Sequence, residues 1–81
     1  MTDTTKAIIW SNNGCSLCEQ AKILLKMNDI EYEERNLASG LWTRDQLNEA
    51  VPNARTVPQI FINERYIGGF TELRTYLQEA V

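Results

Sequence analysis

Histidine is absent from this chain of 81 residues, and cysteine occurs only twice, at Cys15 and Cys18. Histidine is the side chain that most often acts as a general base, so catalysis that depends on an imidazole is excluded. A structural zinc site needs four ligands, usually from cysteine and histidine, and two cysteines alone cannot complete one. The sequence therefore predicts no metal site of its own, and any iron–sulfur cluster would need ligands from outside the chain.

Long apolar runs are also missing. No run approaches the roughly 20 residues that a membrane-spanning helix needs, and residues 1–5 lack the apolar segment of a secretory signal. We therefore expect a cytoplasmic protein without membrane association, a compartment in which paired cysteines are more often catalytic than structural. The formal net charge of −3, without any basic stripe, argues against nucleic acid as a partner.

The chain is long enough for one small domain, and we expect residues 1–81 to form it. A hydrophobic content of 43% and a charged content of 23% are typical of a folded globular chain rather than a disordered one. Repeats, low-complexity tracts and linkers are not found in it. A second domain is therefore not expected.

The pattern of apolar residues and turn formers predicts an α/β domain with the element order β-α-β-α-β-β-α. The first two strands flank a helix, which favours a right-handed crossover that leaves them parallel. The last two strands are joined by a tight polar turn and form an antiparallel hairpin. The expected elements are strand 6–10, a helix from about Ser16 to Asn28, strand 30–37, helix 44–51 capped by Thr43, strands 59–62 and 66–68, and a helix from Thr71.

Apolar side chains at helical spacing indicate which face of each helix is buried. Trp42, just ahead of the second helix, is expected to pack at the entrance of that helix, with a substrate contact as the alternative. The inward positions are expected to be Leu17, Ala21, Leu24, Leu25 and Asn28 in the first helix, Leu47, Ala50 and Val51 in the second, and Leu73, Tyr76, Leu77 and Ala80 in the third.

The two cysteines lie in the motif Cys15-Ser16-Leu17-Cys18, where the first strand gives way to a helix. Residues three apart on a helical turn lie close enough for their sulfurs to bond and separate again. The unpaired N–H groups of a first helical turn favour an anion, so the pKa of the Cys15 thiol is expected to be lowered. Cys15 is the predicted attacking thiolate and the more enclosed Cys18 the predicted resolving thiol; a static disulfide or two inert thiols are the alternative.

Two further motifs precede or follow the hairpin strands. In Thr56-Val57-Pro58, the proline stands directly before a strand, which favours a cis Val57–Pro58 bond that turns the N–H and C=O of Val57 outward. A trans proline that merely starts the strand is the alternative. In Gly68-Gly69-Phe70-Thr71-Glu72, free amides and the Thr71 hydroxyl at a helix start could accept a small carboxylate, although a plain turn is the simpler reading.

Together these three motifs resemble the glutaredoxin family, and the resemblance extends from Ala7 to about Leu77. It implies a thioredoxin fold, a four-stranded mixed sheet flanked by three helices, with glutathione as co-substrate and no permanently bound cofactor. It further implies that Cys15 takes the glutathionyl sulfur and that Val57 pairs with the backbone of the glutathione cysteine. The neighbours of Val57 in that site are Thr56 and Pro58, and the γ-glutamyl end is held by Gly69, Thr71 and Glu72.

The sequence departs from the family pattern at three places. One is position 71, often acidic or serine in the family, where Thr71 keeps the capping ability but not a charge. Asn12 stands where the family usually has a lysine that binds the glycine carboxylate of glutathione, so we expect Arg44, rather than Lys6 or Arg55, to supply the cation. The motif reads Cys-Ser-Leu-Cys instead of the commonest Cys-Pro-Tyr-Cys. The loop is therefore expected to be less rigid and to lack an aromatic wall, and Ser16 offers a hydroxyl to the Cys15 thiolate.

The sequence thus predicts a monomeric, glutathione-dependent thiol–disulfide oxidoreductase that acts on disulfide-containing or glutathionylated proteins. Ribonucleotide reductase is the protein substrate that the resemblance suggests first, and nothing in the sequence selects it. Reduction by thioredoxin reductase is one alternative, favoured by Asn12. Another is a carrier protein in which two chains, each through its Cys15, and two glutathiones together hold one [2Fe–2S] cluster.

Overall fold

The computed structural model describes residues 5–79, and the order of its elements is the one predicted from the sequence. No predicted boundary differs from the observed one by more than one residue. The elements are β1 (Lys6–Ser11), α1 (Ser16–Met27), β2 (Glu31–Asn36), α2 (Arg44–Ala50), β3 (Gln59–Ile62), β4 (Arg65–Gly68) and α3 (Phe70–Glu79).

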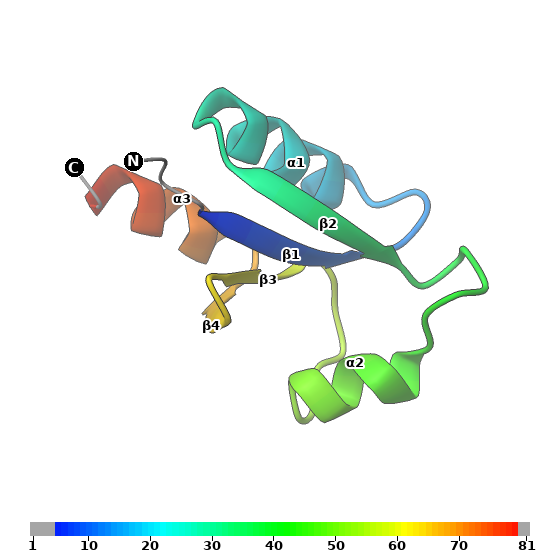
Figure 1. Ribbon diagram of the computed structural model, residues 1–81. Coiled ribbons are helices and arrows are strands. Elements are labelled where there is room, and N and C mark those ends of the chain that lie inside the picture. Colours follow the sequence, from blue (N-terminus) through cyan, green and yellow to red (C-terminus); the bar gives the residue numbers. More distant parts are fainter. Residues whose placement is uncertain (1–4, 80–81) are drawn as a thin grey trace.

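The strands form one mixed sheet in the order β2-β1-β3-β4. β1 pairs with β2 in parallel and with β3 antiparallel, and β3 pairs with β4 antiparallel. α1 and α3 lie on one face of this sheet and α2 lies on the other (Figure 1). The predicted thioredoxin fold is therefore confirmed, with β1 as a central strand.

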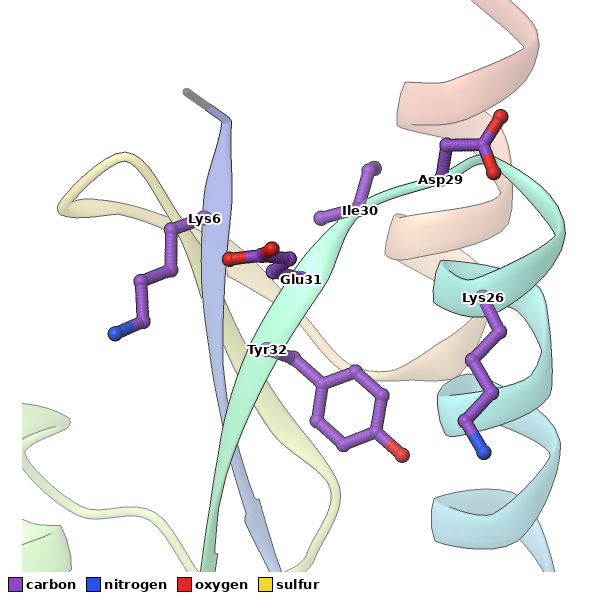
Figure 2. Close-up of a pocket in the computed structure, with 6 residues that line it drawn as sticks. All are labelled: Lys6, Lys26, Asp29, Ile30, Glu31 and Tyr32. Carbon is purple, nitrogen blue, oxygen red and sulfur yellow. The ribbon is translucent and has the colours of Figure 1, made fainter. Parts of the chain in front are cut away.

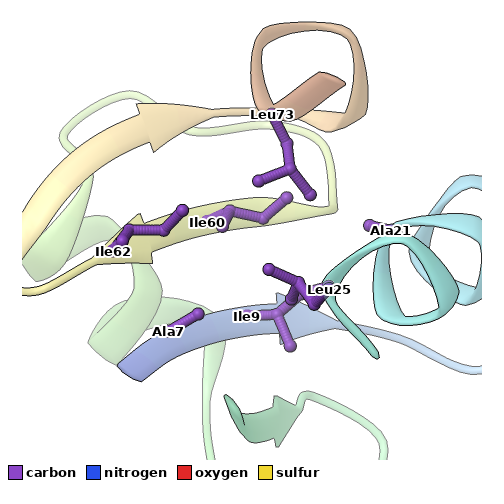
Figure 3. Close-up of a cluster of buried hydrophobic side chains, with 7 residues drawn as sticks. All are labelled: Ala7, Ile9, Ala21, Leu25, Ile60, Ile62 and Leu73. Atoms are coloured by element: carbon purple, nitrogen blue, oxygen red, sulfur yellow. The ribbon is translucent and has the colours of Figure 1, made fainter. Parts of the chain in front are cut away.

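The main core fills the space between the sheet and the helices α1 and α3. Its side chains come from alternate positions of β1 and β3 and from the inner faces of the two helices (Figure 3). Burying each such aliphatic side chain contributes about 1.5–3 kcal/mol relative to leaving it exposed. The members are Ala7, Ile9, Ala21, Leu25, Ile60, Ile62 and Leu73, each no more than 2% exposed.

The opposite face of the sheet is covered by α2, through buried Leu47, and by a stack of aromatic and cationic groups. Trp10 is buried in β1, and its ring meets Trp42 edge-on with the ring centroids 5.5 Å apart. The Arg35 guanidinium lies 4.3 Å from the Trp42 centroid and 5.2 Å from that of Trp10. Trp42 therefore packs at the entrance of α2, as predicted.

Four helix positions that were predicted to face inward are exposed. Asn28 is one of them, and its Nδ2 donates to the Leu24 carbonyl oxygen at 2.9 Å. Leu17 is 49% exposed because α1 is rotated so that Cys18, Ala21 and Leu25 form its buried stripe. Ala50 is exposed because α2 has only seven residues and Leu47 alone is buried. Tyr76 is 37% exposed, and Ala80 lies outside the described residues.

The hairpin turn is shorter than predicted. Asn63 and Glu64 both have positive φ, 51° and 69°, the conformation of a two-residue turn between antiparallel strands. Arg65, predicted to belong to the turn, therefore begins β4 and pairs with Ile62. Within residues 5–79 every helix is too short to cross a lipid bilayer.

Candidate functional site

The two cysteines lie at the start of α1 and are joined by a disulfide, with their Cα atoms 5.2 Å apart. Cys15 is the N-cap residue, with an extended backbone, and its Sγ accepts a hydrogen bond from the N–H of Cys18 at 3.1 Å. Cys18 is fully buried, whereas Cys15 is half-buried. The sulfur of Cys15 thus occupies the place that an N-cap oxygen usually takes, facing the positive end of the helix, as predicted.

The backbone of Val57 lies against this sulfur. Its carbonyl oxygen is 3.7 Å from Cys15 Sγ. The oxidised sulfur carries no hydrogen, so we treat this approach as a contact rather than as a hydrogen bond. The Val57–Pro58 bond is cis, as predicted, and Pro58 is buried.

A hollow of about 440 Å³ lies upstream of Val57 in the chain, between α2 and the loop that precedes β3. Its lining offers mainly hydrogen-bond donors and no carboxylate. Asn48 Nδ2 donates to the Ala54 carbonyl oxygen at 2.9 Å and joins the two walls. Among residues 5–79 neither arginine of this hollow is in an ion pair. The lining residues are Arg44, Asn48, Asn53, Ala54 and Arg55.

A second hollow, of about 400 Å³, is lined by the two neighbours of Val57, Thr56 and Pro58, and by residues of β3, β4 and α3. Glu72 is its only charged residue, and the Oε1 atom of Glu72 accepts a hydrogen bond from the Gly69 N–H at 3.0 Å. The prediction that this amide is free was therefore wrong, because Glu72 reaches back over one helical turn to cap it. The lining residues are Thr56, Pro58, Gln59, Tyr66, Ile67, Gly68, Gly69 and Glu72.

Gly68 has a structural reason to be glycine. Its φ is +127°, and a Cβ atom there would stand 2.9 Å from the Cβ and Cγ atoms of Glu72. A larger residue would therefore displace the glutamate from its cap. The two glycines bring the end of the hairpin and the start of α3 into close approach.

The remaining predicted site residues lie outside these hollows. Asn12 Oδ1 accepts a hydrogen bond from its neighbour, the N–H of Asn13, at 2.8 Å, and no cation replaces the family's lysine at that position. Thr71 is exposed in the first turn of α3. The structure thus brings Arg44 to one hollow and Thr56, Pro58, Gly69 and Glu72 to the other, with Val57 between them in the chain and against Cys15.

Sequence reasoning missed a polar chain beneath the second hollow. The Tyr66 hydroxyl donates to Gln59 Oε1 at 2.6 Å, and Gln59 Nε2 donates to the Thr56 carbonyl oxygen at 3.0 Å. Gln59 is only 8% exposed. A polar residue directly after Pro58, at the first position of a buried strand, was the signal in the sequence that could have indicated it.

The sequence model of the family described as Glutaredoxin matches residues 4–67. The chain belongs to the glutaredoxin family. Glutaredoxin 1 of Escherichia coli (strain K12) is 30% identical over 80 residues, which span 91% of this chain and 94% of that protein. The glutaredoxin of Vibrio cholerae serotype O1 is 32% identical over 78 residues, which span 89% of this chain and 90% of that protein.

Solved structures of glutaredoxins have the same fold. Glutaredoxin 1 from Francisella tularensis, complexed with cacodylate, matches with a TM-score of 0.74 and 33% identity, over 94% of this chain and 95% of that one. Reduced Escherichia coli glutaredoxin matches with a TM-score of 0.78 and 29% identity, over 91% of this chain and 94% of that one. With Cys15 and Cys18 joined at the helix start, this member of the glutaredoxin family is a thiol–disulfide oxidoreductase.

A network of charged and polar groups ties α1 to the sheet. Ser11 Oγ donates to Glu34 Oε2 at 2.7 Å, and Lys22 Nζ approaches the same oxygen at 3.0 Å and Glu19 at 2.9 Å. The Ser11 hydroxyl, followed by Lys22, lowers the pKa of Glu34. The carboxylate of Glu19, followed by that of Glu34, raises the pKa of Lys22. These interactions favour the charged forms of Glu34 and Lys22 at neutral pH. Among residues 5–79 no group of three or more possible metal ligands occurs.

A larger hollow, of about 560 Å³, has neither cysteine in its lining. It lies where β1 and β2 begin, and Figure 2 shows Lys6 and Tyr32 pointing to opposite sides of the two strands. Its charged groups are of both signs. The lining residues are Lys6, Lys26, Asp29, Ile30, Glu31 and Tyr32.

Proposed function

We propose that this member of the glutaredoxin family is a glutathione-dependent oxidoreductase that reduces protein disulfides and glutathione–protein mixed disulfides. The observation that carries the proposal is the setting of Val57. Its carbonyl oxygen contacts Cys15 Sγ. The residues that precede it in the chain line a hollow with two arginines, and its two neighbours, Thr56 and Pro58, line another hollow that contains Glu72.

Glutathione matches this arrangement of charges. It is a tripeptide whose central cysteine supplies the sulfur, with a glycine carboxylate at one end and an α-ammonium group and a second carboxylate at the other. A guanidinium is a strong partner for a carboxylate, which fits the glycine end to Arg44 and Arg55. Glu72 then faces the end that carries the ammonium group.

In the proposed reaction the Cys15 thiolate attacks the glutathionyl sulfur of a mixed disulfide. The bond between the two substrate sulfurs breaks, and the protein thiolate leaves and takes up a proton. A second glutathione thiolate then attacks the glutathionyl sulfur on Cys15, which yields glutathione disulfide and restores the Cys15 thiolate. The N–H of Cys18, which donates to Cys15 Sγ at 3.1 Å, stabilises the sulfur whenever it is anionic.

Reduction of a protein disulfide uses both cysteines. Cys15 attacks one substrate sulfur, and Cys18 then attacks Cys15 in the resulting mixed disulfide and releases the reduced protein. The product is the Cys15–Cys18 disulfide, the state found in the structure. Two glutathione molecules return this disulfide to two thiols and leave as glutathione disulfide.

The known relatives support glutathione as the reductant. Buckwheat glutaredoxin, whose crystal structure is a complex with glutathione, shares the fold, with a TM-score of 0.78 at 23% identity over 94% of this chain and 71% of that one. One observation favours a second reductant, thioredoxin reductase. Asn12 provides no positive charge where the family usually has lysine, which weakens one contact to glutathione.

The electron donor decides between these two reductants. The protein is supplied with a glutathionylated peptide and either glutathione, glutathione reductase and NADPH, or thioredoxin reductase and NADPH, and NADPH oxidation is followed. We expect turnover with glutathione at least about ten times faster than with thioredoxin reductase, because the two hollows fit glutathione. If only thioredoxin reductase supports turnover, glutathione is not the reductant and the proposal is wrong.

A further inference from the structure

Two hydrogen bonds connect the hairpin to the segment that lies against Cys15. The Tyr66 hydroxyl donates to Gln59 Oε1 at 2.6 Å, and Gln59 Nε2 donates to the Thr56 carbonyl oxygen at 3.0 Å. Both ends of the Gln59 amide are therefore used. The Thr56 carbonyl can only accept, so it sets which way the amide points, and the phenol, which donates here, anchors the other end of the amide. Because Gln59 is 8% exposed, water gives its amide little alternative.

The bond to Thr56 also constrains Val57. The carbonyl of Thr56 and the N–H of Val57 belong to the same peptide group, which is planar, with the oxygen and the hydrogen on opposite sides. A donor that holds the Thr56 oxygen thereby sets the direction of the Val57 N–H. The carbonyl oxygen of the same Val57 is 3.7 Å from Cys15 Sγ, so this N–H belongs to the residue that lies against the reacting sulfur.

We propose that Tyr66 and Gln59 are positioning residues that hold the Val57 N–H in the direction needed to bind the backbone of a disulfide partner at Cys15. Neither side chain contacts the sulfurs, and both act through the Thr56–Val57 peptide group. The inference rests on the proposed function only in placing the partner alongside Val57. It holds for a peptide disulfide as well as for glutathione.

A substitution at Tyr66 can remove one hydrogen bond of this series and leave the rest of the side chain in place. Its ring lies against Phe61, with the centroids 5.4 Å apart, and is half-exposed. The substitution Tyr66→Phe keeps this ring contact and removes only the hydroxyl. The Oε1 atom of Gln59 then loses its partner and the amide is held at one end only, so its hydrogen bond to the Thr56 oxygen is positioned less firmly.

The experiment compares Tyr66→Phe, Gln59→Met and the double variant, with Tyr76→Phe as a matched control. Tyr76 is an exposed tyrosine of α3 and has no hydrogen bond among residues 5–79. The substrate is a glutathionylated peptide with glutathione as reductant. We expect KM for the peptide to rise roughly 2- to 10-fold, the equivalent of one lost hydrogen bond, with kcat changed less than about twofold.

Two further readouts separate positioning from general stability. The Val57 amide signal in ¹⁵N–¹H spectra should shift in Tyr66→Phe and not in Tyr76→Phe. The double variant should match Gln59→Met alone, because the phenol acts only through Gln59. A lowered melting temperature with unchanged KM and an unmoved Val57 signal would overturn the proposal, as would additive effects on KM.

The choice of substrate also separates this inference from the proposed function. KM is measured a second time with the disulfide of a peptide that contains no glutathione, with thioredoxin reductase as reductant. If glutathione supports no turnover but Tyr66→Phe still raises this second KM, the proposed function fails and the positioning role stands. If glutathione supports turnover and Tyr66→Phe leaves both KM values unchanged, the positioning role fails alone.

Discussion

The two ends of the sheet differ in what their hollows contain. At the end where β1 and β2 begin, a hollow of about 560 Å³ has charges of both signs, and its side chains leave from both faces of the sheet (Figure 2). At the cysteine end, two smaller hollows contain one sign of charge each and adjoin the segment that lies against Cys15. A reactive group and ordered charges beside it therefore indicate function better than volume does.

The strongest test of this comparison removes each sulfur of the cysteine end in turn. Cys15→Ser is expected to abolish turnover of glutathionylated peptide, because the nucleophile is lost. Cys18→Ser is expected to keep that activity, because glutathione itself reduces the glutathionylated Cys15. The variant is expected to lose reduction of protein disulfides, because Cys18 resolves the mixed disulfide between Cys15 and the protein. Both variants are measured with glutathione, glutathione reductase and NADPH.

The two cysteines differ enough in setting for the outcomes to separate. Cys15 is half-buried at the N-cap, whereas Cys18 is fully buried within the first turn of α1. Turnover that persists in Cys15→Ser would contradict the assigned roles. So would equal loss of deglutathionylation in both variants, provided that both remain folded by circular dichroism.

Much of the fold could be predicted because it depends on neighbouring residues. The strand before Cys15 and the helix after it follow from the apolar pattern, and Thr43 does cap α2, with Gln46 completing the capping box. The exposure of Leu17 could not be predicted in this way. It depends on how α1 is rotated against the sheet, and neighbouring positions on a helix differ by only 100°.

The candidate site shows the same limit. The cysteine motif and the cis bond at Pro58 could be predicted from short motifs. The position of Gln59 directly after Pro58 could have indicated that a polar group there needs partners, but its partner Tyr66 could not be predicted, because the two side chains meet only in the folded hairpin. The capping of Gly69 by Glu72 was missed for a simpler reason: the amides were treated as free without asking which nearby side chain could reach them.

A charge reversal at each end sharpens the comparison further. Arg44→Glu places a negative charge in the hollow beside Val57, and Lys26→Glu makes the same change in the far hollow. We expect Arg44→Glu to raise KM for glutathionylated peptide about tenfold, because a charged hydrogen bond to the glycine carboxylate is lost. Lys26→Glu should change KM less than about twofold, because Lys26 lines the hollow where β1 and β2 begin and neither hollow beside Val57 includes it.

The two variants have the same net charge, so a general effect of charge would act on both. Equal increases in KM would contradict the assignment of the carboxylate to Arg44. Measurement at higher ionic strength adds a second check. The difference between the variants should shrink as salt screens the exposed guanidinium.

The smallest expected effect concerns stability rather than binding and involves Glu34, which ties β2 to α1. The Ser11 hydroxyl and Lys22 hold the pKa of Glu34 below its ordinary value of 4.5. A carboxyl with a lowered pKa in the folded state stabilises the fold above its unfolded pKa, and this contribution is lost as pH falls through the folded pKa. Glu34→Gln should therefore lower the free energy of unfolding by about 1 kcal/mol at neutral pH.

The pH dependence distinguishes this ion network from a simple packing change. At a pH below the folded pKa of Glu34 the wild-type carboxyl is protonated, so the difference between wild type and Glu34→Gln in urea unfolding should be smaller there than at neutral pH. Glu49→Gln, an exposed substitution on α2, serves as the control and should show little difference at either pH. A loss of unfolding free energy in Glu34→Gln that is equally large in acid would contradict the electrostatic origin. KM should stay at the wild-type value, because neither hollow beside Val57 includes Glu34.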